Sequence, residues 1–288
     1  MKSKIWNLFF SALAIAVLTG GCQKPAEKAG GQQEGYITIK GSDTMVHLVT
    51  AWVERYMQKK PGVDISVTGG GSGTGIAAMI NGSTQIAMSS RDFKAEELKL
   101  VKDKGITPIP HTTALDGISV IVNPATTIDE LTMEQLRRIF NGTITNWKEV
   151  GGPDQPIAIL SRESNSGTYV YFQEEVLKKD DYAATARLIP SSAAIIQAAE
   201  QDQGVIGYVG IAYAESGKVK TLKVKKTAGE PGVVPTLENI KSGAYPISRP
   251  LYLFTNGQPT GESKNFIDFV FSPEGQAIAR EVGYIPVK

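Results

Sequence analysis

The chain alternates between two patterns of hydrophobic and polar residues. Short apolar segments with β-branched side chains predict strands at residues 36–40, 63–67, 85–88, 115–122, 156–160 and 205–209. Segments whose apolar residues recur at helical spacing predict helices near residues 45–57, 76–80, 95–104, 131–140, 167–177, 191–201 and 263–282. Because strand and helix alternate throughout, the pattern is typical of an α/β protein with largely parallel sheets.

Two segments interrupt this alternation and indicate where the chain passes between two folded regions. Asn123 and Pro124 break the apolar strand that precedes them, because proline fixes its own φ and lacks a backbone N–H. Residues 245–254 are extended and look like a return crossing. We therefore take residues 123–124 and 245–250 as the candidate hinge segments.

The first 22 residues have the pattern of a targeting segment. Lys2 and Lys4 give a basic start, residues 8–18 are mostly apolar, and small residues precede Cys22. This arrangement resembles a bacterial lipoprotein signal, which implies that Cys22 becomes the lipidated first residue. Thr19 departs from that pattern, since a large aliphatic residue is usual there, and an ordinary signal with an incidental cysteine is the alternative.

Cys22 is also the only cysteine, so no disulfide can form within the chain. Residues 23–35 are rich in Gly, Gln, Glu, Lys and Ala, with almost nothing apolar to bury. This composition predicts a flexible tether, after which the folded part begins near Tyr36.

Composition narrows the classes of function. The chain has 288 residues and a formal net charge of +1. A balance so close to neutral gives no overall field that would favour nucleic acid or an anionic membrane surface. Any preference for anions must therefore come from a local site. The two histidines, His47 and His111, do not form a spaced metal-ligand pair, and we expect neither a metal nor a cofactor.

Three predicted strand-to-helix turns are rich in hydroxyl groups and glycine, at residues 41–44, 68–75 and 161–168. The first N–H groups of a helix have no partner inside it and lie at the positive end of its dipole, so such turns bind anions. In α/β sheets these turns lie at the carboxyl ends of strands, where ligands bind. Simple helix capping, or a plain linker for residues 68–75, is the structural alternative.

The stretch 161–168 adds an arginine to this chemistry. Arg162 lies four residues before Ser166, and its planar guanidinium fork suits a tetrahedral oxyanion. We interpret the stretch as an anion clamp. The loop around Ser72 fits neither of two enzyme motifs: a nucleotide P-loop needs a lysine that is missing, and the nucleophile elbow of hydrolases needs a glycine where Thr74 stands.

Five short motifs follow one another along the chain: Gly-Ser-Asp-Thr (41–44), Gly-Gly-Gly-Ser-Gly-Thr-Gly (69–75), Met-Ser-Ser-Arg (88–91), Ile-Thr-Asn-Trp (144–147) and Arg-x-x-x-Ser-Gly-Thr (162–168). In this order they resemble the phosphate-binding subunits of bacterial phosphate ABC importers, from Ile37 to about Pro286. The resemblance implies an α/β fold of the two-lobed, type II periplasmic binding protein (Venus-flytrap) kind with a two-segment hinge. Lobe 1 would comprise residues 36–122 and 247–288, and lobe 2 residues 123–246.

The resemblance also implies a function and partners. The protein would capture inorganic phosphate in the cleft between its lobes and deliver it to the transmembrane subunits of an ABC permease, driven by a separate ATPase. It would act outside the cytoplasm, in the periplasm or at the cell surface, and touch the membrane only through its lipid. We expect a monomer, no nucleic-acid partner and no enzymatic activity.

Residue by residue, the resemblance carries a phosphate-binding role to Ser42, Thr44, Ser72, Arg162, Ser166, Gly167 and Thr168. Many members place an aspartate where this chain has Ser90; that aspartate accepts a proton from phosphate and rejects sulfate. Ser90 can accept a hydrogen bond but repels a fully deprotonated anion less, and Arg91 beside it is a candidate second cation. Asp43 or Asp116 is a hypothesis for the missing acceptor, with helix capping and a plain turn as the respective alternatives.

Two other functions stay open at this point. Ser90 leaves room for a binding protein that takes another oxyanion, such as sulfate, molybdate or an organophosphate. An exported phosphoester hydrolase would use Ser72 or Ser166 as its nucleophile and would need a general base nearby. His47 lies in a predicted helix and His111 in a predicted loop, and neither is an evident base.

Overall fold

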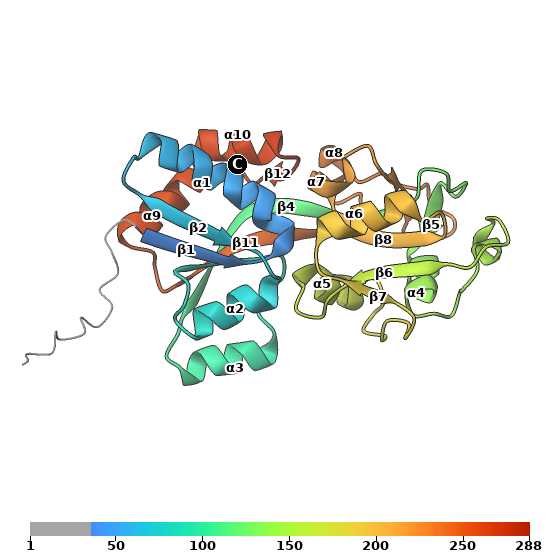
Figure 1. Ribbon diagram of the computed structural model, residues 1–288, viewed down its shortest axis with the longest axis horizontal. Coiled ribbons are helices and arrows are strands. Elements are labelled where there is room, and N and C mark those ends of the chain that lie inside the picture. The colour runs from blue at the N-terminus through green and yellow to red at the C-terminus, as the bar shows by residue number, and fades with distance from the viewer. Residues whose placement is uncertain (1–35) are drawn as a thin grey trace, which may run out of the picture. The chain divides into compact units, whose positions relative to one another are not determined.

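The structure is a computed structural model that describes residues 36–288 (Figure 1). The predicted signal segment, its Cys22 and the predicted tether at residues 23–35 lie outside the described residues. Within residues 36–288, no helix combines the length and the apolar composition needed to cross a bilayer.

The first lobe is built from both ends of the described chain. Its N-terminal elements are β1 (Tyr36–Gly41), α1 (Val46–Lys59), β2 (Asp64–Thr68), α2 (Ser72–Ile80), β3 (Ile86–Ser89), α3 (Ala95–Asp103) and β4 (Pro108–Val122), which continues into the second lobe. Its C-terminal elements are β11 (Ser248–Asn256), α9 (Gly261–Val270), α10 (Pro273–Glu281) and β12 (Ile285–Pro286). Figure 1 shows α1 and α10 on one side of strands β1 and β2, with α2 and α3 on the other.

The second lobe contains the middle of the chain. Its elements are β5 (Glu130–Thr132), α4 (Met133–Phe140), β6 (Ala158–Arg162), α5 (Gly167–Glu175), β7 (Arg187–Ile189), α6 (Ser192–Gln201), β8 (Val205–Gly210), α7 (Ile211–Ala214), β9 (Lys220–Thr221), β10 (Lys223–Lys225) and α8 (Leu237–Lys241). Two 3-10 helices, at Asp43–Met45 and Trp147–Val150, complete the described elements. Thr132 caps α4, because its hydroxyl accepts the N–H of Gln135 while the Gln135 side chain accepts the N–H of Thr132.

One sheet runs through both lobes, in the order β2-β1-β3-β11-β4-β8-β6-β7. Within the lobes the strands are parallel: β1 pairs with β2 and β3, and β6 pairs with β7 and β8. The crossing strands β4 and β11 are antiparallel to each other and to their outer neighbours β8 and β3. The predicted α/β architecture is confirmed, as a mixed sheet whose antiparallel part lies where the lobes join.

Each lobe buries apolar side chains on both faces of its part of the sheet. In the first lobe, a cluster containing Trp52 lies under α1, α9 and α10, and a smaller one lies under α2 and α3. In the second lobe, a cluster containing Trp147 lies under α4, α5 and α8, and another lies under α6 and α7. These separate apolar clusters distinguish the two lobes of the one sheet.

The two crossing strands change from one core to the other at neighbouring positions. On β4, Ala114 packs in the first lobe's core and Ile118 in the second's. On β11 the order is reversed, since Ile247, just before the strand, belongs to the second lobe's core and Leu251 to the first's. This change lies earlier on β4 than Asn123, where the sequence suggests the crossing; the lobe bounds given above stay a prediction.

Two helices depart from the predicted bounds for local reasons. The predicted helical region 263–282 is divided into α9 and α10, because Ser272 caps α10 and Pro273 occupies its first position, where a missing N–H costs nothing. Helix α2 begins at Ser72 rather than near Ile76, so part of the predicted glycine loop forms the first helical turn.

Candidate functional site

Three buried serines meet at the ends of strands β1 and β3 and the start of α2. The Ser42 hydroxyl lies 3.0 Å from Ser90 Oγ, and Ser72 Oγ lies 3.2 Å from the same atom. The backbone N–H of Ser90 donates to Ser72 Oγ at 3.0 Å. All three side chains are at most 1% exposed. Residues that are up to 48 positions apart in the sequence thus form one cluster of hydroxyl groups.

Two threonines join the lobes beside this cluster. Thr44 Oγ1, from the turn after β1, lies 2.9 Å from Thr168 Oγ1 in the first turn of α5. A guanidinium nitrogen, Arg249 Nη2, lies 3.0 Å from the Thr168 hydroxyl and 3.5 Å from that of Thr44. Arg249 comes from the crossing strand β11. The turn after β1, helix α5 and strand β11 therefore meet at these hydroxyls.

The N-terminus of α5 completes the second lobe's contribution. Ser166 is the N-cap, and its Oγ accepts the N–H groups of Thr168 and Tyr169. This use of its lone pairs leaves the hydroxyl hydrogen free to donate. A Cβ added to Gly167 would lie 2.3 Å from Ser72 Oγ and 2.6 Å from Ser90 Oγ, so only glycine allows this helix to approach the serine cluster.

Arg162 lies at the end of β6, almost fully buried. Its Nε donates to the carbonyl of Ile189, its Nη1 to the Ser192 hydroxyl, and its Nη2 to the carbonyl of Pro190. The same Nη2 lies 3.2 Å from the Asp43 carboxylate of the first lobe. Burial lowers the pKa of Arg162 and the nearby Asp43 opposes that shift, yet a guanidinium stays charged in proteins.

The sequence leaves Asp43 as either a proton acceptor for the ligand or a helix cap. In the structure it caps a helix, but one of the other lobe. Its Oδ2 accepts the backbone N–H and the hydroxyl of Ser192, the first residue of α6, at 2.8 and 2.9 Å. The turn after β1 is therefore joined to the second lobe by a carboxylate as well as by Thr44.

Asn165 makes two further contacts between the lobes. Its carbonyl accepts the N–H of Gly73 at 2.9 Å, and its side-chain Nδ2 donates to the carbonyl of Gly70 at 2.8 Å. Gly71 lies between them with φ +107°, and a Cβ there would be 2.8 Å from the Asn165 carbonyl. The glycine-rich turn is needed both for its backbone conformation and for this close approach.

Arg91 is buried but already paired. Its two Nη atoms bind the two oxygens of Glu97, each at 2.7 Å, and its Nη1 also donates to the Asp92 carbonyl. Burial tends to raise the pKa of Glu97, but the bonds from Arg91 and from the N–H of Lys94 outweigh it and lower that pKa. The positive charge of Arg91 is therefore neutralised by Glu97. That Arg91 binds the ligand stays a prediction.

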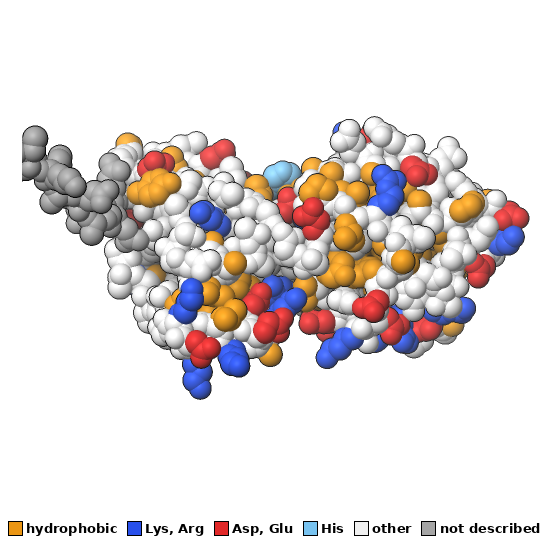
Figure 2. Space-filling model, turned by 60° about the horizontal axis from the view of Figure 1, so that its bottom comes forward, with side chains coloured by type: hydrophobic (Ala, Val, Ile, Leu, Met, Phe, Trp, Pro, Cys, Tyr) orange, Lys and Arg blue, Asp and Glu red, His pale blue; other side chains and the backbone are white. Residues whose placement is uncertain are grey.

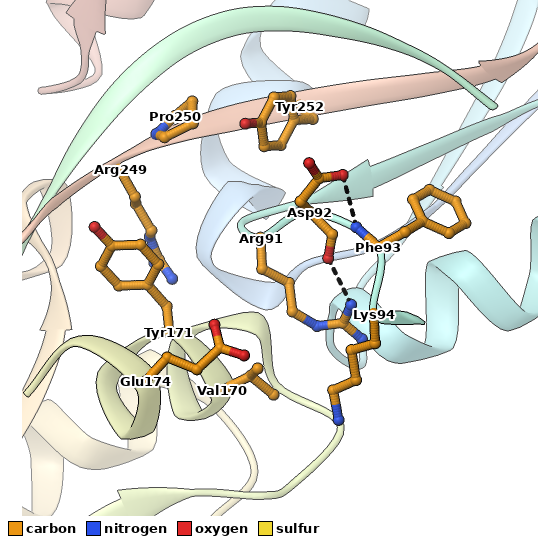
Figure 3. A pocket seen from close by; sticks show the side chains of 10 residues that line it. All are labelled: Arg91, Asp92, Phe93, Lys94, Val170, Tyr171, Glu174, Arg249, Pro250 and Tyr252. Carbon is orange, nitrogen blue, oxygen red and sulfur yellow. Dashed lines mark hydrogen bonds between the residues drawn. The ribbon is translucent and has the colours of Figure 1, made fainter. Parts of the chain in front are cut away.

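A cavity of about 220 Å³ adjoins these residues (Figure 3). Its wall includes Arg91 from the first lobe, Tyr171 and Glu174 from α5, and Arg249 and Tyr252 from β11. Figure 3 shows the side chains of Arg91 and Arg249 both extending toward α5. Arg91 Nε and Arg249 Nη1 are among the buried side-chain nitrogens of the described residues that have no hydrogen-bond partner.

Asp116 and Arg249 form an ion pair that the sequence analysis does not predict. Asp116, in the middle of β4 rather than in a turn, is fully buried and lies 2.9 Å from Arg249 Nη2. Complete burial raises the pKa of Asp116, and the facing guanidinium offsets part of that increase. An arginine and an aspartate within otherwise apolar strand patterns were the available signal, since such residues are seldom buried unless paired.

The charges of the site balance one another. Arg91, Arg162 and Arg249 pair with Glu97, Asp43 and Asp116, respectively. On the face seen in Figure 2, acidic and basic side chains are interspersed, in keeping with a net charge of +1. An anion would thus be held by directed donors and local dipoles more than by a general positive field.

Comparisons with known proteins agree with this geometry. Residues 26–274 match the family model described as PBP superfamily domain. The phosphate-binding protein PstS of Bacillus subtilis is 35% identical over 285 residues, which covers 96% of this chain and 91% of that protein. This chain belongs to the PstS family of the PBP superfamily. The PstS protein of Pseudomonas aeruginosa is 33% identical, covering 91% of this chain and 85% of its own.

A similar protein has been solved with its ligand bound. The X-ray structure of a putative phosphate ABC transporter substrate-binding protein from Clostridium perfringens contains bound phosphate. It is 34% identical, superposes with a TM-score of 0.80, and the match covers 88% of this chain and 100% of that one. The predicted two-lobed periplasmic binding protein fold and the predicted family are both confirmed.

Proposed function

We propose that this protein binds inorganic phosphate between its lobes and delivers it to the membrane subunits of an ABC importer. One observation carries the proposal: the hydroxyl-bearing turns that begin at Ser42, Ser72 and Ser166 meet at one buried place, with the Arg249 guanidinium at its edge. The names of the PstS relatives and the phosphate bound in the Clostridium perfringens structure support the choice of ligand.

The proposed binding residues divide between the lobes. The first lobe would supply Ser42, Thr44, Ser72, Ser90 and the charge of Arg91, and the second would supply Arg162, Ser166, Gly167 and Thr168. A phosphate that leaves water must regain its hydrogen bonds, because burying an unpaired anion is very costly. Serine and threonine hydroxyls can each donate one hydrogen bond, and they can rotate from one another toward the anion.

Because the donors come from both lobes, the anion itself would hold the closed form together. A ligand shifts a conformational equilibrium by its difference in affinity for the two states, which here favours closure. The permease would recognise the closed form. We place the protein outside the cytoplasm, anchored by a lipid on Cys22 and monomeric, with a separate ATPase driving uptake.

Sulfate or molybdate is the second candidate ligand. It is favoured by the absence of a free carboxylate among the hydroxyls, since Asp43 and Asp116 are both bound to arginines. A carboxylate that can accept a proton from the ligand would reject sulfate, whereas Ser90 offers only a hydroxyl.

Hydrolysis of phosphate esters is the less supported alternative. The His47 ring stacks on Tyr213 at 4.7 Å, and His111 Nε2 bonds to the Thr255 hydroxyl at 2.9 Å. Among the described residues, neither histidine hydrogen-bonds to Ser72 or Ser166, so neither is placed to act as the base for these serines.

Calorimetric titration of the mature protein with phosphate, sulfate and molybdate, between about pH 5 and pH 8, tests the proposal. We expect saturable, one-to-one binding of phosphate, without release of product from a phosphate ester. Tight binding of sulfate with no response to phosphate would replace phosphate by the second candidate. No binding of any of the three would refute the function itself.

A further inference from the structure

Arg249 is held on one edge and free on the other. Its Nε and Nη2 both donate to Asp116 Oδ2, at 3.2 and 2.9 Å, and this fixes the plane of the guanidinium. Nη2 also reaches the hydroxyls of Thr168 and Thr44. The remaining nitrogen, Nη1, lies on the edge turned away from Asp116 and has no hydrogen-bond partner among residues 36–288, although Arg249 is only 2% exposed.

An unpartnered donor in a nearly fully buried side chain calls for an acceptor. Leaving a charged group's hydrogen-bonding capacity unused costs more than leaving a neutral one's, so buried guanidiniums are normally satisfied. Arg249 lines the cavity of Figure 3, with its guanidinium 5.7 Å from the centre of the Tyr171 ring. An acceptor bound to Arg249 Nη1 would have the Thr44 and Thr168 hydroxyls on one side and the cavity on the other.

Arg249 also has a distinct place in the fold. It is directly opposite Asp116 in the pairing of β11 with β4, so the ion pair joins the two crossing strands. The pair lies between Ala114 and Ile118 on β4, and between Ile247 and Leu251 on the other chain segment, where the side chains change from one lobe's core to the other's. The pair is therefore located where the two lobes join.

From these observations we propose that Arg249 is a second guanidinium that binds the anion, in addition to Arg162, and that it links the bound anion to the hinge. The inference rests on the proposed function and adds a residue to its site. The anion accepts hydrogen bonds from Nη1 and Nη2, while Asp116 holds the guanidinium in place as a positioning residue. Because Arg249 Nη2 contacts Thr44 of the first lobe and Thr168 of the second, its contact with the anion depends on these two residues coming together.

The test compares charge-altered variants of the mature protein by phosphate titration. Replacing Arg249 alone would leave Asp116 buried and unpaired, so the main variant is the double change Arg249→Met with Asp116→Asn, which removes both charges. Arg249→Lys keeps the charge but loses the planar fork. Arg137→Met is the matched control, since Arg137 pairs with Asp180 on the surface of the second lobe. Melting temperature is measured for each variant, and small-angle scattering follows closure.

We expect the double variant to lose roughly 10- to 150-fold in phosphate affinity, the value of a charged hydrogen bond, at a melting temperature sufficient for it to be folded at 25 °C. Arg249→Lys should recover part of that loss, and saturating phosphate should compact the double variant less than the wild type. A double variant that binds phosphate within threefold of the wild type, or that closes as fully, would overturn the inference and leave the proposed function intact. If the wild type binds none of phosphate, sulfate and molybdate, both are wrong.

Discussion

A single methyl group at Gly167 should keep the lobes from approaching as closely as they do in the wild type. Gly167 is the first residue of α5, in the second lobe, and its Cα faces the serine cluster of the first. In Gly167→Ala the new Cβ would lie 2.3 Å from Ser72 Oγ, 2.6 Å from Ser90 Oγ and 3.0 Å from Ser72 Cβ. The hydroxyls can rotate away, but the contact with Ser72 Cβ remains, because that atom is fixed to the backbone of α2.

The size of the effect follows from these distances. Carbon atoms in contact are normally about 3.5–4.0 Å apart, so the lobes must separate by several tenths of an ångström or more. The Thr44–Thr168 contact, 2.9 Å in this structure, would then lengthen toward the limit of a hydrogen bond. Overpacking a close-fitting contact typically costs about 1–3 kcal/mol, which corresponds to roughly a 5- to 150-fold loss of phosphate affinity.

Stability should change little, which makes the experiment selective. The added methyl group conflicts with the other lobe and not with its own helix, so the melting temperature without ligand should not fall appreciably. Phosphate affinity is measured by calorimetry, with Gly229→Ala as the control, since Gly229 has no atom within 4 Å of the position of an added Cβ. If Gly167→Ala binds phosphate as tightly as the wild type, the geometric reasoning for closure is refuted.

Three further predictions concern contacts around the cleft. Arg162→Ala should weaken phosphate binding by at least about 100-fold in calorimetry, because it leaves a carboxylate partner without its cation; a change of only a few-fold would contradict its assignment. Asn165→Ala removes one neutral hydrogen bond between the lobes and should raise the phosphate Kd roughly three- to tenfold, with little change in melting temperature. Because the pKa of Glu97 is lowered in the folded protein, its ionised form contributes stability above the unfolded value of 4.5 that is lost as the pH falls. Glu97→Gln should therefore melt below the wild type at pH 7, and the gap should narrow toward about pH 3; a gap that does not depend on pH would contradict the role of the Arg91 pair.

Much of the site could be predicted because its parts follow a local rule. Ser42, Ser72 and Thr168 each stand where a strand passes into a helix, and parallel strands bring such turns to one edge of a sheet. The sequence therefore predicts which turns meet, although it does not indicate that α2 already begins at Ser72. The motif resemblance then supplied the ligand class, which the turns alone leave open.

Other features depend on contacts between distant segments and leave no local signal. Asp43 caps α6 of the other lobe rather than its own helix, and Arg91 binds Glu97, which the helix α3 happens to present. The extended segment around Arg249 predicts only a crossing between the lobes, so the sequence does not indicate that Arg249 lies at the site. Its direct pairing with Asp116 depends on the register between β11 and β4, and an alternating pattern does not reveal register.

The contacts that Asn165, Arg162 and Asp43 make across the cleft consist of protein atoms alone, and this has a consequence for transport. Each of them lowers the free energy of the shut conformation whether or not cargo is present, so less ligand energy is needed to reach it. Because these contacts do not need the ligand, some unloaded molecules would also adopt the shut conformation that a permease would recognise. Stronger contacts between the lobes would improve phosphate capture at low concentration, but they would also increase binding of unloaded protein to the permease. Weakening the Asn165 contacts is the simplest way to reduce that unproductive binding.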